Sequence, residues 1–161
     1  MRMEYEADGH QWSVVATVDI GIGRLASVFE DDDDCHAIVS LVVTLDPREA
    51  GLSSVFPVVL RPDELLPAAE LVGRAATKLA GMKPPRPSDP YKPLARGVGL
   101  LVGHLNLGEP GMVMMSRHAP TQRLILPPAH LPSLVGLLRQ TYYKLREREH
   151  FVDMPTNPAL H

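Results

Sequence analysis

The chain contains very little cysteine and few aromatic residues. Of its 161 residues, one is cysteine (Cys35), one is tryptophan, four are tyrosine and three are phenylalanine. A single cysteine excludes an intramolecular disulfide and a zinc site built from several cysteines. No apolar run approaches the ~20 residues that a membrane-spanning helix needs, and the first residues have no apolar core like that of a signal peptide. These absences lead us to expect a cytoplasmic protein that does not enter a membrane.

Motifs that carry catalysis are missing as well. The glycines of "DIGIGR" (19–24) are followed by neither a predicted helix nor a Lys-Ser/Thr pair, so they do not predict a phosphate-binding loop. There is no Gly-x-Ser-x-Gly sequence. No two histidines are spaced i and i+4 in a predicted helix, although His104 and His118 could lie on adjacent strands and hold a metal. We expect a non-enzymatic protein with no cofactor and no metal, and keep the two-histidine site as the alternative.

Charge is divided unequally between the two halves of the chain. Residues 1–80 carry six Lys/Arg and fourteen Asp/Glu, whereas residues 81–161 carry ten Lys/Arg and five Asp/Glu. Such a division is typical of two halves that attract each other or a neighbouring chain. It also suits a basic working face in the second half.

The first half of the chain predicts four strands and a helix. Apolar residues alternate in "VVATVDIGI" (14–22), which is the period of a strand, and three further strand-like segments follow before residue 61. Pro62 then suits the first turn of a helix, because its missing N–H would have had no partner there. Apolar residues recur at helical spacing until Gly81 ends the pattern.

A proline-rich connector separates this half from a second half of the same plan. Five prolines between positions 84 and 93 remove hydrogen-bond donors and restrict φ, which predicts an extended, semi-rigid segment. Three strands, at 97–107, 112–117 and 121–126, and a closing helix are predicted beyond it. The expected division is a first unit at 1–81, the connector at 82–95, a second unit at 96–150 and a tail at 151–161.

An offset of 66 residues relates the two halves. Both "PVVLRPDELLPAAELV" (57–72) and "RLILPPAHLPSLVGLL" (123–138) run from an apolar segment through proline into a helix. At this offset similar residues pair along the two segments: Leu60 with Leu126, Pro62 with Pro128, Leu65 with Leu131, Val72 with Leu138, Lys78 with Lys144 and Leu79 with Leu145. The shared offset indicates an internal duplication. We expect an α+β fold in which two similar antiparallel-sheet-plus-helix (ββββα-like) units form a pseudo-twofold domain.

This tandem β-β-β-β-α plan, over residues 12–149, resembles the Whirly family of single-strand DNA binders and the related dimeric transcriptional-coactivator domain. The resemblance lies in the order of the elements. In that family the sheets present the nucleic-acid face and the helices hold subunits together. The resemblance therefore implies a protein that binds single-stranded nucleic acid through a sheet face.

Two groups of charged residues are candidate binding sites. The candidate nucleic-acid contacts are the basic residues on or next to the predicted strands of the second unit: Lys92, Arg96, Arg117 and Arg123. The alternative is a protein-interaction or inhibitor module that attracts a basic partner through the acidic loop Glu30–Asp34, with the carboxylates Asp31, Asp32, Asp33 and Asp34.

We also expect a homo-oligomer. Exposed strand edges and apolar helix stripes wider than one sheet can cover are commonly buried by self-association. Closed twofold dimers are the most frequent result.

Overall fold

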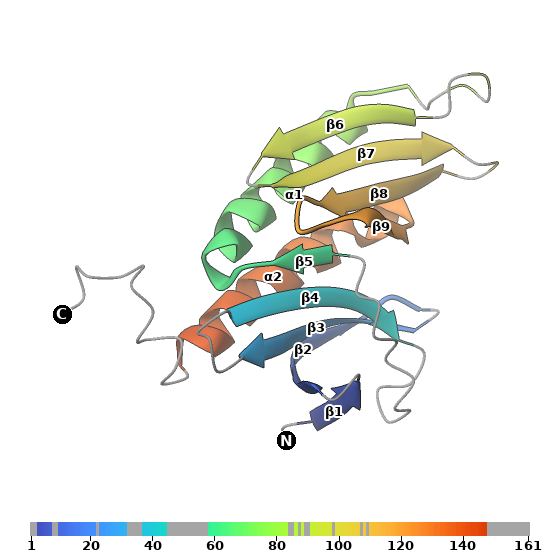
Figure 1. Ribbon diagram of the computed structural model, residues 1–161. Coiled ribbons are helices and arrows are strands. Elements are labelled where there is room, and N and C mark those ends of the chain that lie inside the picture. Colours follow the sequence, from blue (N-terminus) through green and yellow to red (C-terminus); the bar gives the residue numbers. More distant parts are fainter. Residues whose placement is uncertain are drawn as a thin grey trace, which may run out of the picture.

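The computed structural model consists of two antiparallel sheets and two helices (Figure 1). The residues that it describes are 3–7, 10–21, 23–31, 37–44, 58–83, 86, 88, 91–97, 99–106, 108 and 110–147, with the backbone alone at 3–7, 10–12, 31, 37 and 44. No helix among them is long and apolar enough to cross a membrane.

Each sheet is a simple meander in which neighbouring strands follow one another in the chain. The first sheet contains β1 (Met3–Ala7), β2 (His10–Asp19), β3 (Arg24–Asp31), β4 (Ala37–Thr44) and β5 (Val58–Leu60). The second sheet contains β6 (Tyr91–Gly97), β7 (Leu100–Asn106), β8 (Pro110–Ser116) and β9 (Ala119–Leu126). All pairings within the two sheets are antiparallel.

A helix follows each sheet at the same place in each unit. β5 leads through a 3-10 turn at Pro62–Glu64 into α1 (Leu65–Ala80), and β9 leads through a 3-10 turn at Pro128–His130 into α2 (Leu131–Arg146). Both the turns and the helices are separated by 66 residues, so the offset found in the sequence holds at the start and the end of both helices. The predicted α+β fold of two similar units is confirmed.

The strands differ from the prediction in two places. Neither β1 nor β6 was predicted, and β6 lies mostly inside the segment that the sequence assigns to the connector. Pro93 lies in β6, where an irregularity in the pairing falls between Pro93 and Ala95. A proline is tolerated in such a strand because β6 is the edge of its sheet and the irregularity interrupts the ladder.

The two units exchange their helices. α1 packs on β6 and β7 of the second sheet, whereas α2 packs on β2 and β3 of the first, and the two helices contact each other extensively. The contact of α2 with the first sheet includes hydrogen bonds. The hydroxyl oxygens of Thr141 and Ser27 are 2.6 Å apart, and Lys144 Nζ donates to the Val15 carbonyl at 3.3 Å. Each helix therefore buries the sheet of the other half.

The result is one apolar core shared by both halves. α1 contributes the buried alanines Ala68, Ala69 and Ala75 together with two leucines and a valine, whereas α2 contributes five buried leucines. The sheets meet along β5 and β9, with the helices behind them in Figure 1. Leu60, at the end of β5, and Leu126, at the end of β9, are both buried in this core.

Because of this exchange, we expect neither half to fold alone. The fragment 1–81 lacks the helix that covers its sheet, and the fragment 82–161 lacks α1. Exposed sheet faces of this size leave too little buried apolar surface to offset the loss of chain entropy. Circular dichroism should show no cooperative thermal unfolding for either fragment, and a cooperative transition for the equimolar mixture. A cooperative transition in the isolated 1–81 fragment would contradict the exchange.

Candidate binding surface on the second sheet

The second sheet has one face on the helices and one face away from them. Residues paired across antiparallel strands share a face, and alternate residues along a strand point to opposite faces. The register pairs Arg96 with Leu101, Leu101 with Met115, and Val113 with Ile125. We call the face away from the helices the outer face. It carries Tyr91, Pro93, Arg96, Leu101, Gly103, Leu105, Gly111, Val113, Met115, Arg123 and Ile125.

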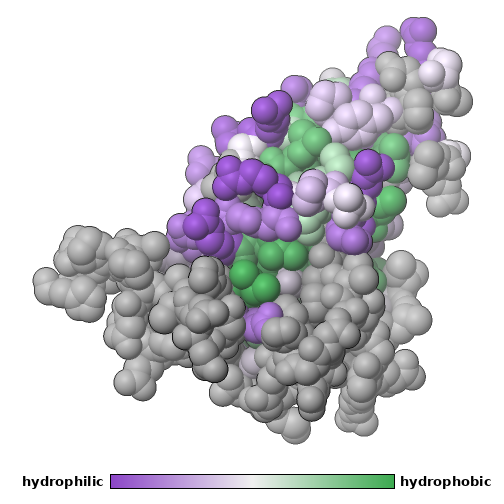
Figure 2. Space-filling view, in the orientation of Figure 1, coloured by the Kyte–Doolittle hydropathy of each residue, from purple (hydrophilic) through white to green (hydrophobic). Residues whose placement is uncertain are grey.

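The outer face is apolar in its middle and partly open to solvent, although Val113 there is buried. Ile125 is 52 % exposed, and Leu101, Leu105 and Met115 are half-buried. Arginine is the only charged residue type among the outer-face residues. Figure 2 shows apolar side chains over the second sheet with hydrophilic ones around them. Contiguous exposed apolar surface bordered by polar residues is typical of a site that binds another molecule.

The corresponding face of the first sheet is buried. Val14, Ala26, Val28 and Val42 form a separate apolar cluster there. The register pairs Val14 with Val28 and Ala26 with Val42, which places them on one face, and none belongs to the core beneath α2. The two units therefore have the same fold but differ in the burial of their outer faces. The outer face of the second sheet is the more accessible one.

Two arginines line a pocket at one end of the second sheet. The pocket has a volume of about 460 Å³ and is lined by Arg96 and Gly97 of β6, Gly99, Leu100 and Leu101 at the start of β7, and Met115, Ser116, Arg117 and Pro120 around the β8–β9 turn. Gly99 has a φ of +71°, a conformation that favours glycine. The Arg117 N–H donates to its carbonyl at 2.6 Å, which fastens the two turns together.

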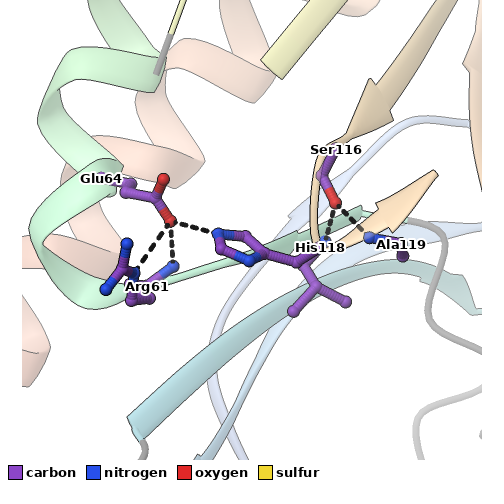
Figure 3. Close-up of polar contacts among 6 residues, drawn as sticks. Arg61, Glu64, Ser116, His118 and Ala119 are labelled. Carbon is purple, nitrogen blue, oxygen red and sulfur yellow. Dashed lines mark hydrogen bonds and ion pairs between the residues drawn. The ribbon is translucent and has the colours of Figure 1, made fainter. Parts of the chain in front are cut away.

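A buried carboxylate fixes the β8–β9 turn from the side of the first unit (Figure 3). Glu64, only 6 % exposed, accepts a 2.8 Å hydrogen bond from the Arg61 backbone N–H. Its Oε1 also lies 2.9 Å from His118 Nε2, which must carry the proton because a carboxylate can only accept. Ser116 Oγ accepts from the Val59 N–H of β5 at 3.2 Å. These contacts attach the edge of the first sheet to the turn that carries Arg117.

Tyr91 lies flat on the outer face at the other end. A Cβ on Gly103 would overlap Tyr91 Cε2, so the ring rests directly on the glycine backbone. The Tyr91 hydroxyl is buried and has no hydrogen-bond partner among the described residues. The ring packs against the sheet and does not stand out as a platform on which a base could stack.

The structure separates the four basic residues that the sequence groups together. Arg96 and Arg117 line one pocket, and Arg123 lies on the outer face in β9. Lys92 pairs with His104, which is buried among the residues that face the helices, so Lys92 belongs to the opposite face from Arg96. The pairing irregularity between Pro93 and Ala95 causes this, because one extra residue reverses the faces of all that follow.

The acidic candidates lie almost entirely outside the described residues. Glu30 and Asp31 end β3, with only the backbone of Asp31 described, and Asp32, Asp33 and Asp34 are not among the described positions. The two histidines of the alternative metal site, His104 and His118, lie apart in the structure. His118 follows Ser116, which pairs with Leu100, four residues along β7 from His104. In the described ranges no group of three or more His, Cys, Asp or Glu side chains could hold a metal.

His104 is a buried histidine without a polar partner. It is 4 % exposed and lies between Lys92 and Met112 in the register of the sheet. Neither ring nitrogen has a hydrogen-bond partner within the described ranges. Burial lowers the pKa of His104 below its usual value of 6.5, and the nearby charge of Lys92 lowers it further. The folded protein therefore favours the neutral imidazole.

Sequence reasoning missed the aliphatic part of the outer face. The uninterrupted apolar runs "LLV" (100–102) and "MVMM" (112–115) are typical of strands with two apolar faces. These runs could have predicted the apolar outer face. The contact of Glu64 with His118 joins residues 54 positions apart, and no local pattern reports it.

No protein-family model matches the chain, and no curated protein is significantly similar to it. The site must therefore be interpreted from its own geometry.

Replacing Glu64 with alanine should destabilise the protein by about 1–3 kcal/mol, because it leaves the Arg61 N–H without its acceptor and removes the contact with His118. Asp63→Ala is the matched control, since Asp63 is an exposed acid in the same turn. Urea unfolding measures both variants. If both variants lose the same free energy of unfolding, Glu64 contributes no more to stability than any acid at the start of a helix.

His104 should make the protein less stable in acid. Because its folded pKa is lowered, the unfolded chain takes up a proton below pH ~6.5 that the folded protein does not. The wild type should therefore lose stability relative to His104→Leu as pH falls from about 7.5 to about 5, with most of the loss below about 6.5, and Lys92→Met should weaken this dependence. Urea unfolding across this range measures it. A difference in the free energy of unfolding between the wild type and His104→Leu that does not change with pH would contradict the prediction.

Proposed function

We propose that the protein is a non-enzymatic binding module that holds a segment of a partner protein on the outer face of its second sheet. The partner segment combines aliphatic side chains with carboxylates. The observation that carries this proposal is the open aliphatic surface around Leu101, Met115 and Ile125, whose neighbouring charges are arginines.

The chemistry of the surface favours a protein over a nucleic acid. Protein interfaces are enriched in methionine and arginine, and the outer face carries Met115, Arg96 and Arg123. Single-stranded nucleic acid is held by aromatic rings on which bases stack. Tyr91, the one aromatic residue among those of the outer face, packs on Gly103.

Nucleic acid is the second candidate because Arg96 and Arg123 lie on the outer face, which carries no carboxylate among the described residues, and Arg117 lies at its end. Such a surface can neutralise phosphates, and the resemblance to Whirly proteins implies the same sheet-face mode of binding. The two candidates differ in their dependence on salt and on the aliphatic residues.

Selection from a displayed library of random peptides tests the proposal. Peptides enriched on the wild type should contain leucine-like residues beside Asp or Glu, and a synthetic copy should bind in fluorescence anisotropy. Ile125→Glu should weaken that binding at least about tenfold, equivalent to about 1.4 kcal/mol, because it places a carboxylate in the apolar surface. Gln140→Glu is the matched control, since Gln140 is exposed on α2 and distant in sequence from the second sheet.

Three results would overturn the proposal. The first is enrichment of peptides without acids, or binding that Ile125→Glu leaves unchanged. The second is binding of a labelled oligothymidine that falls steeply between about 50 and 200 mM salt, which would assign the surface to nucleic acid. The third is a dimer in light scattering that Ile125→Glu dissociates, which would assign the surface to a second copy of the chain.

A further inference from the structure

The pocket between Arg96 and Arg117 is chemically different from the rest of the outer face. The outer face in its middle is aliphatic, whereas the pocket adds two guanidinium groups to an apolar lining of Leu100, Leu101, Met115 and Pro120. Its volume of about 460 Å³ is that of a site for a ligand the size of one or two amino acids.

We propose that this pocket binds a carboxylate carried on an aliphatic residue, with the carboxylate between Arg96 and Arg117 and the aliphatic group on Leu101 and Met115. This deepens the proposed function by naming the anchor of the partner segment. The site is nevertheless testable with small molecules, which need no partner protein.

Two separate elements bring the arginines to the pocket. Arg96 lies in β6 beside Leu101, its partner in the register, and Leu101 in turn pairs with Met115 of β8. Arg117 follows in the β8–β9 turn, which the 2.6 Å hydrogen bond to Gly99 holds against the β6–β7 turn. A side chain at Gly99 would come within 3.3 Å of Arg117 Cβ, so the absence of one leaves room for the arginine.

The arginines are available for an anion. Neither Arg96 nor Arg117 has an ion-pair partner within 4.0 Å among the described residues. Glu64 approaches the same region, but its Oε1 is engaged by His118 and the Arg61 N–H. Its Oε2 faces Gly99. With two cations against one partly satisfied carboxylate, the pocket keeps a net positive charge.

The lining favours a carboxylate on an apolar body over a polyphosphate or a bare ion. Guanidinium groups pair with carboxylates through two parallel hydrogen bonds, and the apolar side chains beside them can contact an aliphatic body attached to the carboxylate. A highly hydrated ligand such as inorganic phosphate gains nothing from Leu100, Leu101 or Pro120.

Titrations followed by amide NMR of the full chain test the site. N-acetyl-leucine, which resembles a chain terminus, should shift the Gly97, Gly99 and Leu101 amides and saturate with a dissociation constant on the order of 1 mM, as expected for so small a ligand. N-acetyl-leucinamide, which lacks the charge, should not. N-acetyl-leucyl-glutamate with an amidated terminus tells whether a side-chain carboxylate serves as well as a terminal one.

Variants complete the test. Arg96→Gln and Arg117→Gln should each weaken N-acetyl-leucine binding about tenfold, and Arg123→Gln is the matched control because Arg123 lies on the outer face but outside the pocket. Arg96→Lys keeps the charge and should bind less tightly than the wild type, since an ammonium cannot form the bidentate pair. Thermal unfolding verifies that each variant is folded.

The results that would contradict the carboxylate site differ from those that would contradict the proposed function. Equal shifts with N-acetyl-leucinamide, no saturable shift, or equal weakening by Arg123→Gln would overturn the site. Inorganic phosphate binding as tightly as N-acetyl-leucine would overturn the assignment to an aliphatic carboxylate. If N-acetyl-leucine binds as expected while peptide selection fails, the pocket stands and the partner-protein function does not.

Discussion

The structure depends on the contact between α1 and α2. Each helix comes from one half of the chain and covers the sheet of the other half, so the two helices must pass each other in the middle of the molecule. α1 buries three alanines beside its larger residues, whereas α2 buries five leucines, so the two helices contribute side chains of different size to the shared core. Neither sheet can bury its inner face unless the helix pair forms.

This contact explains why buried polar groups occur where the units meet. Bringing the helices together also brings the edge of β5 against β8 and β9, where an unpaired strand edge would leave donors without partners. Ser116 accepts the hydrogen bond of the Val59 N–H, and Glu64 holds His118. The same polar contacts set the position of the β8–β9 turn, so the frame that joins the units also orients Arg117.

Much of the fold is readable from the sequence because its signals are local. The offset of 66 residues depends on prolines and leucine spacing, and it holds in both helices and both 3-10 turns. Which sheet each helix covers is not readable, since an apolar stripe fits either sheet. β1 alternates apolar and charged residues over only the five positions Met3–Ala7, which is a weak signal, and its pairing with β2 is a tertiary effect.

The candidate site was only partly predictable for a related reason. In a regular strand, Lys92 and Arg96 would share a face because they are four residues apart, but the irregularity at Pro93–Ala95 reverses that relation. Arg96 and Arg117 are brought together by pairing between strands, which spacing along the chain does not report. The exposure of Ile125 likewise depends on what covers the sheet, and not on the strand itself.

The difference between the two units is the strongest argument for the binding surface that we propose. Both sheets have an apolar inner face that the helices bury, and that face serves folding in each unit. The apolar outer face of the first sheet is buried as well. The outer face of the second sheet combines the exposed Ile125 and the half-buried Leu101, Leu105 and Met115 with the exposed Arg96 and Arg123. Because exposed apolar surface has a free-energy cost in water, its occurrence on one of two equivalent faces is best explained by a molecule that covers it.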